Sequence, residues 1–260
     1  MIKAIMSLGT PLVLAVSVAA CQPVAQSETT VSNMSEISVE TAIQRKALDV
    51  GQRVSQWQVD QIEQGNYDYI PQRYRRVTQD AKGWVQAAFY VGLTQWAGTV
   101  KDPVLTQHIA DMAYRERYSL LLRRIAHADD HAIAQSYLWV TEQTGNQDAY
   151  KLTHKHFDRI IEDHNPELSL EMIPQDPKNR VWGYEGLCQD RWCWADALFM
   201  SPRAWLKMSN ITGDPKYFEH GDKEFWATVD YLFTDKYGLF YRDSHYFEKK
   251  SDNGKPVFWS

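Results

Sequence analysis

Apolar side chains recur at helical spacing along most of the chain. From Val39 onward, the first run places a set of apolar residues on one stripe of an amphipathic helix: Ile43, Ala47, Val50, Val54 and Trp57. Further helical patterns lie at about residues 82–97, 103–126, 131–144, 147–162, 196–210 and 215–232. Near the end, residues 237–242 predict a short strand or extended turn. The chain is therefore predicted to be mainly α.

Short breaks separate these helices, at Gly98 to Pro103, at Gly145-Asn146 and at Gly213-Asp214-Pro215. In the last break, Asp214 can cap the following helix and Pro215 can occupy its first turn. Short connections of this kind join antiparallel helix pairs. A longer loop with three prolines lies between Asn165 and Gln189, and a loop of that length inside a compact domain is more often functional than idle.

Two all-α architectures are built from consecutive helix pairs, the α-solenoid and the concentric helical barrel. A repeat of about 34 residues would indicate a tetratricopeptide solenoid, and the sequence shows no such period. The helical pattern alone leaves the choice open.

The first residues predict an export signal. Lys3 precedes the uncharged and mostly apolar run from Ile5 to Ala20, which is too short for a stable transmembrane span. The run ends Val18-Ala19-Ala20-Cys21, which resembles a bacterial lipobox, and Gln22 follows as in lipoproteins sent to the outer membrane. We expect a signal peptide at 1–20, lipidation at Cys21, a polar tether at 21–37 and a domain at 38–260. An ordinary cleaved signal peptide is the alternative.

The composition is that of a globular protein, with 44% hydrophobic and 23% charged residues. The 28 Lys and Arg against 33 Asp and Glu leave no basic excess to neutralise phosphates, so no nucleic-acid partner is expected. The 10 Trp, 14 Tyr and 9 Phe can fill a core or form flat surfaces on which sugar rings stack. Beyond Cys21, Cys188 and Cys193 could form one small disulfide. The histidine spacings do not predict a metal site.

The most informative segment is Trp192 to Pro202, which reads Trp-Cys-Trp-Ala-Asp-Ala-Leu-Phe-Met-Ser-Pro. It resembles the W-x-D-x-L-F-M-x-P signature of glycoside hydrolase family 105, the unsaturated uronyl hydrolases related to family 88. Residues 128–135, 212–217, 222–228 and 239–244 continue the resemblance, which covers about residues 40–260. The last residues, Val257 to Ser260, resemble the start of the family's W-x-R-G-N-G-W motif.

The resemblance implies an all-α (α/α)6 barrel of consecutive helical hairpins. A complete barrel needs about twelve helices, and the hydrophobic pattern predicts roughly seven. The sequence also ends before the R-G-N-G-W segment, which in the family helps to bind the uronate. We therefore expect only the N-terminal part of the barrel, incomplete at its C-terminus.

The chemistry that the resemblance implies is hydration of a double bond. Polysaccharide lyases leave a C4=C5 double bond on the terminal uronic acid, and a single carboxyl group can protonate it and then activate water. By resemblance, Asp196 is this general acid/base. Its apolar neighbours Trp194 and Phe199 should raise its pKa by desolvation. The alternative is that Asp196 only caps the helix that follows.

The resemblance also implies substrate contacts. Of the adjacent carboxylates Asp129 and Asp130, Asp130 is expected to bind sugar hydroxyls, although both could simply stabilise a helix N-terminus. Trp194, Trp84 and Trp259 are candidates for sugar contact, with core packing an equal alternative for Trp84. Arg242 could bind the uronate or a sulfate bidentately, or be an ordinary surface arginine.

Together these features predict a lipid-anchored unsaturated uronyl hydrolase of the cell envelope, with no metal or organic cofactor. Its substrate would be a lyase-generated, rhamnose-containing oligosaccharide of the ulvan or rhamnogalacturonan type, with a terminal unsaturated uronic acid. Membrane contact would be made through Cys21. Two alternatives remain, a non-catalytic surface glycan-binding lipoprotein and an α-solenoid interaction protein.

Overall fold

The structure is a computed structural model that describes residues 29–121, 126–172, 188 and 191–259. The predicted signal peptide 1–20, Cys21 and most of the loop between Asn165 and Gln189 lie outside these residues. The chain forms two compact units, Met1–Gln52 and Arg53–Ser260.

Helix α1 (Thr29–Glu63) belongs to both units and begins inside the range 21–37 that the composition assigned to a tether. Neither Pro nor Gly occurs between residues 24 and 50, so nothing in this polar segment interrupts a helix.

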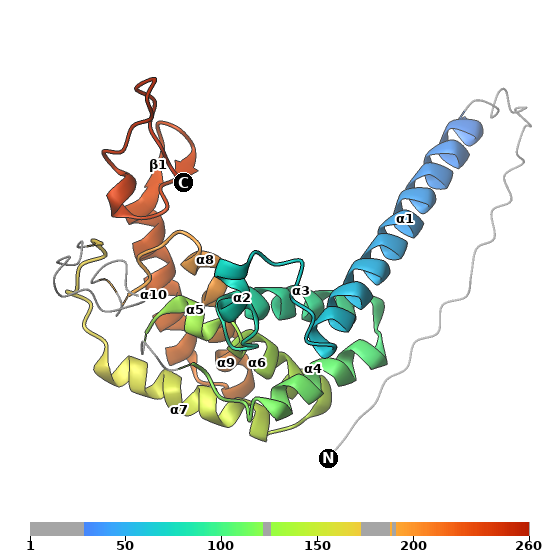
Figure 1. Cartoon of the computed structure of the whole chain (residues 1–260), viewed down its shortest axis with the longest axis horizontal. Helices are drawn as coiled ribbons and strands as arrows, with labels where there is room; N and C mark the ends of the chain where they lie inside the picture. The colour runs from blue at the N-terminus through green and yellow to red at the C-terminus, as the bar shows by residue number, and fades with distance from the viewer. Residues whose placement is uncertain (1–28, 122–125, 173–187, 189–190, 260) are drawn as a thin grey trace, which may run out of the picture. The chain divides into compact units, whose positions relative to one another are not determined.

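The second unit is a succession of helices followed by a small β-hairpin (Figure 1). Its helices are α2 (Gln72–Thr78), α3 (Trp84–Val100), α4 (Pro103–Arg115), α5 (Ala128–His131), α6 (Ala134–Thr144), α7 (Asp148–Asp163), α8 (Ala197–Met200), α9 (Pro202–Thr212) and α10 (Pro215–Leu232). The strands β1 (Phe233–Thr234) and β2 (Leu239–Phe240) pair antiparallel, and a short 3-10 helix η1 (Ser244–Tyr246) follows. The predominantly helical fold predicted from the sequence is confirmed.

Tight connections create three helix pairs, α3–α4, α6–α7 and α9–α10, whose members pack against each other. In two of these pairs the first helix ends at a glycine with left-handed backbone angles, Gly145 after α6 and Gly213 after α9. As predicted, the Asp214 carboxylate accepts a hydrogen bond from the Lys216 N–H, and Pro215 opens α10. The short breaks in the sequence therefore mark the turns of helical hairpins.

Helix α6 lies at the centre of these pairs and packs on α3, α4, α7 and α9. Its residues from Ala134 to Thr141 are all buried. A helix that is buried on every side has no solvent-facing polar stripe, and this segment accordingly contains no charged residue.

The first predicted helix is present, but its predicted apolar stripe is not a buried face. In the first unit Ile43 is 64% exposed, and in the second unit Val54 and Trp57 are 60% and 50% exposed. The buried residues of α1 in the second unit are Ser55 and Val59, one turn apart on another face. The helical spacing of apolar residues therefore predicted the helix correctly, but it did not identify the face of the helix that is buried.

The helix predicted over 103–126 ends early, at Arg115. Arg117 and Tyr118 adopt left-handed backbone angles, with φ of 53° and 54°. The Tyr118 N–H donates to the Ala113 carbonyl at 3.0 Å, and the Arg117 N–H donates to the Tyr114 carbonyl at 2.9 Å. This is a Schellman ending made without glycine, so no punctuation in the sequence marked it.

Trp205 of α9 packs closely against both α7 and α10. The Trp205 ring stacks on Phe157 at 3.8 Å between ring centroids, and both side chains are fully buried. Trp205 also contacts Gly221 of α10, where a Cβ atom would come within 2.7 Å of the Trp205 Cβ. Only glycine lets the two helices approach this closely.

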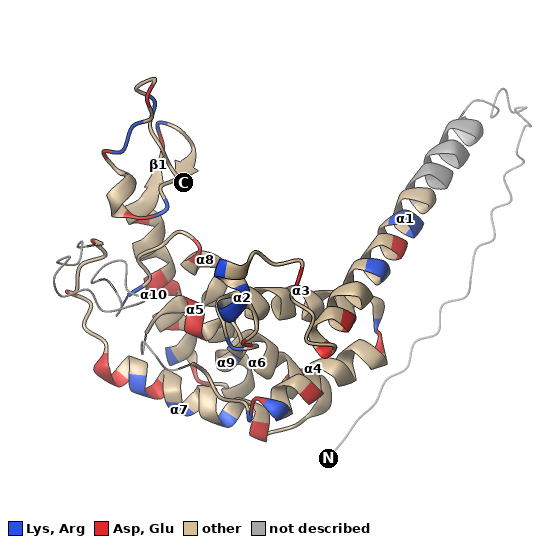
Figure 2. Ribbon diagram, viewed as in Figure 1, with Lys and Arg blue, Asp and Glu red and all other residues tan. Residues whose placement is uncertain are grey.

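Acidic and basic side chains are interspersed along α1, α4 and α7 (Figure 2). None of the described helices combines the length and the apolar character that crossing a bilayer requires.

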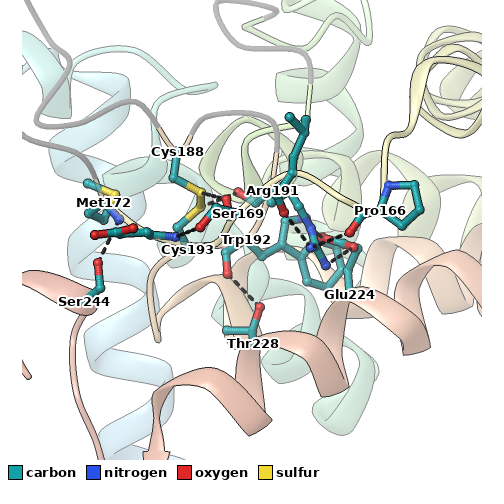
Figure 3. The surroundings of a disulfide bond; sticks show 12 residues. Pro166, Ser169, Met172, Cys188, Arg191, Trp192, Cys193, Glu224, Thr228 and Ser244 are labelled. Carbon is teal, nitrogen blue, oxygen red and sulfur yellow. Dashed lines mark hydrogen bonds and ion pairs between the residues drawn. A yellow bond between two sulfur atoms is a disulfide. The ribbon is translucent and has the colours of Figure 1, made fainter.

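A disulfide between Cys188 and Cys193 closes a small ring just before Trp194 (Figure 3). The bridge that the sequence allowed is therefore present. Both cysteines are buried in a small apolar cluster with Leu170 and Met172.

Replacing Gly221 by alanine should destabilise the protein, because the new methyl group cannot fit against the Trp205 Cβ. We expect a loss of about 1–3 kcal/mol in the free energy of unfolding, measured by urea denaturation. Gly92→Ala is the matched control, since its Cβ would meet nothing within 4 Å on helix α3 and should stabilise by roughly 0.5–1 kcal/mol. Equal effects of the two changes would contradict this packing.

Removing the disulfide should also cost stability. For so short a loop, chain entropy gives the bridge a contribution of roughly 2 kcal/mol. We expect the double variant Cys188→Ser/Cys193→Ser to unfold at lower urea concentration, and a dithiol reductant to shift the wild type equally. The same reductant should leave the double variant unchanged, and a shift there would point to another cause.

Candidate active site

Asp196 occupies the position just before α8, and its side chain makes no capping hydrogen bond to that helix. The position of Asp196 alone would suggest that it caps α8, but its half-buried carboxyl group does not do so. Burial raises its pKa above the ordinary value, and the nearby Asp243 carboxylate adds to this rise. A hydrogen bond from its own backbone N–H and the charge of Arg242 oppose the rise. The desolvation expected from the apolar neighbours is present.

The acidic pair lies on α5, which packs against α8. Asp130 has no exposed surface, whereas the Asp129 side chain is 21% exposed. The two adjacent side chains thus point in different directions, as helical geometry requires. Of the two carboxylates Asp129 is the one that solvent reaches, and contact between Asp130 and a sugar stays a prediction.

Buried polar contacts join the acidic segment to the Trp192–Pro202 segment. His131 Nδ1 and Ser201 Oγ are 2.7 Å apart, and both side chains are fully buried. The Gln135 amide donates to the carbonyls of Phe199 at 3.1 Å and Met200 at 2.8 Å. These contacts hold together two segments that lie about 65 residues apart in the sequence.

Arg242 belongs to the segment that follows the β-hairpin, and in the fold it lies beside Asp196. Its guanidinium pairs with the fully buried Asp243 at 3.2 Å and lies about 6 Å from two ring centroids, at 5.9 Å from Tyr246 and 5.8 Å from Trp259. Arg242 is thus held by a buried carboxylate and two aromatic rings, unlike an ordinary surface arginine.

The backbone of Arg242 connects the same group of residues. Its carbonyl accepts from the Ala195 N–H at 2.8 Å, and its N–H donates to the Phe258 carbonyl at 2.8 Å. The structure therefore brings Asp196, Arg242 and Trp259 together from three separate segments.

The other two tryptophans differ in their surroundings. Trp194 is half-buried with its ring 4.7 Å from that of His127. Trp84 is the first residue of α3 and is 47% exposed, so the core role weighed for it is not supported. Among the described residues, no ring contact or hydrogen bond links Trp84 to the Asp196 group.

Four residues that the sequence analysis did not single out take part in this arrangement. They are Asp243 beside Arg242, His127 against Trp194, and Arg191 with its partner Glu224. Asp243 follows Arg242 directly within a family-like segment, and that adjacency was the available signal. The Arg191–Glu224 pair spans 33 residues, and no local pattern indicates it.

The described residues contain no cluster of three or more His, Cys, Asp or Glu that could hold a metal ion. What the group offers instead is a half-buried carboxyl with a raised pKa beside a guanidinium and aromatic rings. Such a group can protonate a bound molecule and hold an anionic one.

Comparisons with known proteins identify two relatives that match most of this chain. The chain is 50% identical over 218 residues to an unsaturated 3S-rhamnoglycuronyl hydrolase of Alteromonas sp. (strain LOR), covering 84% of this chain and 52% of that protein. A second protein of the same name, from Formosa agariphila, is 26% identical over 185 residues and is covered to 46%. The chain spans about half the length of these relatives.

Two solved structures share the fold. A glycosyl hydrolase family 88 protein from Bacteroides vulgatus matches with a TM-score of 0.54 at 18% identity, over 78% of this chain and 55% of that one. A polysaccharide lyase matches with a TM-score of 0.51 at 20% identity, over 68% and 48% of the two chains. At these identities the likeness concerns the fold alone, and it favours the barrel type of helical-hairpin architecture over the solenoid.

The profile of Glycosyl Hydrolase Family 88 matches residues 50–260, which include every residue described around Asp196. The resemblance to family 105, itself related to family 88, is consistent with that match. The chain belongs to glycosyl hydrolase family 88.

Proposed function

We propose that the protein is an unsaturated uronyl hydrolase in which Asp196 is the general acid and base. The proposal rests on one observation. The carboxyl group of Asp196 is half-buried, lies beside Arg242 and makes no capping hydrogen bond to α8. Its membership of family 88 and the names of its two curated relatives support the same activity.

The proposed reaction begins with transfer of the Asp196 proton to C4 of the unsaturated uronic acid. Positive charge then develops at C5 and is shared with the ring oxygen. The ionised Asp196 takes a proton from a water molecule as that water adds to C5. The resulting hemiketal opens and releases the rest of the oligosaccharide, so one carboxyl group serves both steps.

A raised pKa suits this role, because the acid must carry its proton at the working pH. The causes are burial first and the Asp243 carboxylate second, while Arg242 limits the rise. An exposed aspartic acid would be ionised near neutral pH and would have no proton to give.

Arg242 is proposed to bind the uronate carboxylate or a sulfate, since a guanidinium matches the geometry of such anions. Its position near the rings of Tyr246 and Trp259 supports this role. Trp194 and Trp259, which is 56% exposed, offer surfaces for the sugar. Asp130 and Trp84 remain proposed substrate contacts with less direct support.

The proposed substrate is a lyase-generated oligosaccharide that carries a terminal 4,5-unsaturated uronic acid linked to rhamnose. The names of both curated relatives refer to a 3S-rhamnoglycuronyl unit, which supports a rhamnose-containing substrate of the ulvan or rhamnogalacturonan type.

A glycan-binding protein without catalysis is the second candidate. The aromatic surroundings of Arg242 would serve binding equally well. The two candidates differ in the need for the Asp196 proton, which binding alone does not use.

We also propose that the protein is anchored at the cell envelope, on the outer membrane, through a lipid on Cys21. The support is the sequence Val18-Ala19-Ala20-Cys21 followed by Gln22. A single acyl chain anchors weakly, whereas a lipobox cysteine that gains several chains is held stably.

Asp196→Asn should abolish turnover and preserve sugar binding, because the amide keeps the shape but cannot deliver a proton. We expect a loss of at least about 10²–10⁴-fold in kcat. The assay follows the fall in ultraviolet absorbance as the conjugated C4=C5 bond is hydrated. The control is Asp163→Asn at the exposed end of α7, which should keep the wild-type rate.

The pH profile offers a further check on the same group. The rate should fall as the pH rises through the raised pKa of Asp196, because the acid then loses its proton. Near-normal turnover by Asp196→Asn would place the proton donor elsewhere. Sugar binding without any turnover by the wild type would favour the binding protein.

Cys21→Ser should release the protein from the membrane fraction, because no lipid can then be attached. Fractionation of cells that express the wild type and the variant measures this by immunoblot. Equal amounts of soluble protein in the two strains would contradict the anchor.

A further inference from the structure

We propose that Arg191 and Glu224 are positioning residues for Asp196. Their buried ion pair holds the turn at Arg191–Cys193, which ends in a disulfide-bonded cysteine, against α10, and that turn leads directly into the segment that carries Asp196. The inference rests on the proposed role of Asp196.

The Arg191 guanidinium is almost fully used within the protein. Its Nε and Nη2 donate to the two carboxylate oxygens of Glu224, at 3.1 Å and 2.7 Å. Its Nη1 donates to the carbonyls of Pro166 at 3.2 Å and Leu168 at 2.9 Å (Figure 3). The side chains of Arg191 and Glu224 are only 9% and 2% exposed. One side chain thus ties two chain segments to α10.

A second contact lies one helical turn along α10. The Thr228 hydroxyl donates to the Trp192 carbonyl at 2.6 Å, and both residues are buried. Glu224 and Thr228 are four residues apart, so they hold consecutive residues of the turn from one face of the helix.

A disulfide bonds the last residue of this turn. Cys193 follows Trp192 and is bonded to Cys188, with their Cα atoms 6.1 Å apart. The cysteines pack with Trp194 and with Ala227 and Tyr231 of α10. Backbone freedom in the residues just before Asp196 is therefore small.

Directly before Asp196, the Ala195 N–H donates to the Arg242 carbonyl and so anchors the backbone to a distant segment. Asp196 makes no capping bond that would hold its side chain on α8. Its placement beside Arg242 consequently depends on the anchors at Arg191, Trp192 and Ala195 before it, together with the contacts that hold α8 after it. Catalysis by proton transfer is sensitive to such placement, since misplacement by about 1 Å can cost roughly 100-fold in rate.

The decisive variants are Glu224→Gln, which removes the charge that pairs with Arg191, and Thr228→Val, which removes only the bond to the Trp192 carbonyl. If Glu224→Gln does not fold, Thr228→Val still tests the positioning role. The control is Glu142→Gln, the same change in an ion pair with Lys207 that joins α6 to α9. We expect kcat to fall by about tenfold or more in either test variant with KM nearly unchanged, and the control to match the wild type.

A shift in the pH profile separates positioning from general destabilisation. Looser anchoring hydrates Asp196 and lowers its pKa, so the alkaline limb of the kcat profile should move to lower pH. The other titratable and charged groups on the elements around Asp196 are unchanged in these variants: His127, Asp129, Asp130, His131, Arg242, Asp243 and His245.

Hydrogen exchange at the Ala195 amide tests the inference independently of activity. We expect faster exchange there in both test variants and unchanged exchange in the control. Wild-type exchange at Ala195 together with wild-type kcat in the test variants would overturn the positioning role. Absence of turnover in the wild type would instead count against the proposed function, and the exchange measurement would still decide the role of Arg191 and Glu224.

Discussion

The arrangement around Asp196 depends on a buried ion pair, that of Arg191 with Glu224. A buried charge is tolerated only where it is paired and its hydrogen bonds are satisfied, and the Arg191 guanidinium meets both conditions with Glu224 and two carbonyl groups. The pair joins the turn before Asp196 to α10, which in turn packs on α9 through Gly221 and Trp205. The Arg191–Glu224 pair thus connects the candidate site to the packed helices α9 and α10.

On the opposite side, Asp196 meets the chain that follows the β-hairpin. Arg242 contributes its carbonyl to Ala195 and its charge to Asp196, and the buried Asp243 holds that charge in place. Burial raises the pKa of Asp196 most, the Asp243 carboxylate adds to the rise, and the Arg242 guanidinium opposes it. This combination, with no side-chain capping bond from Asp196, suits the proposed role of proton donor, which the sequence position of Asp196 alone does not indicate.

Local patterns predicted most of the helices and their turns, because the apolar spacing and the punctuation by Gly145, Gly213 and Asp214 act over a few residues. They did not predict the end of α4, where Arg117 and Tyr118 adopt left-handed angles without glycine. The apolar stripe that they predicted on α1 includes the exposed side chains Ile43, Val54 and Trp57, since periodicity does not say which neighbour a helix meets. Resemblance to a known family marked Asp196 and Arg242, whereas the Arg191–Glu224 contact arises only from tertiary structure.

The central claim is that the surroundings of Asp196 keep its carboxyl group protonated at higher pH than an ordinary aspartic acid. The most direct test is a carbon-13 NMR titration of the Asp196 carboxyl carbon in the intact protein, with its signal assigned by its loss in Asp196→Asn. The account predicts a midpoint clearly above the ordinary value of about 3.9. A midpoint at or below that value would contradict it.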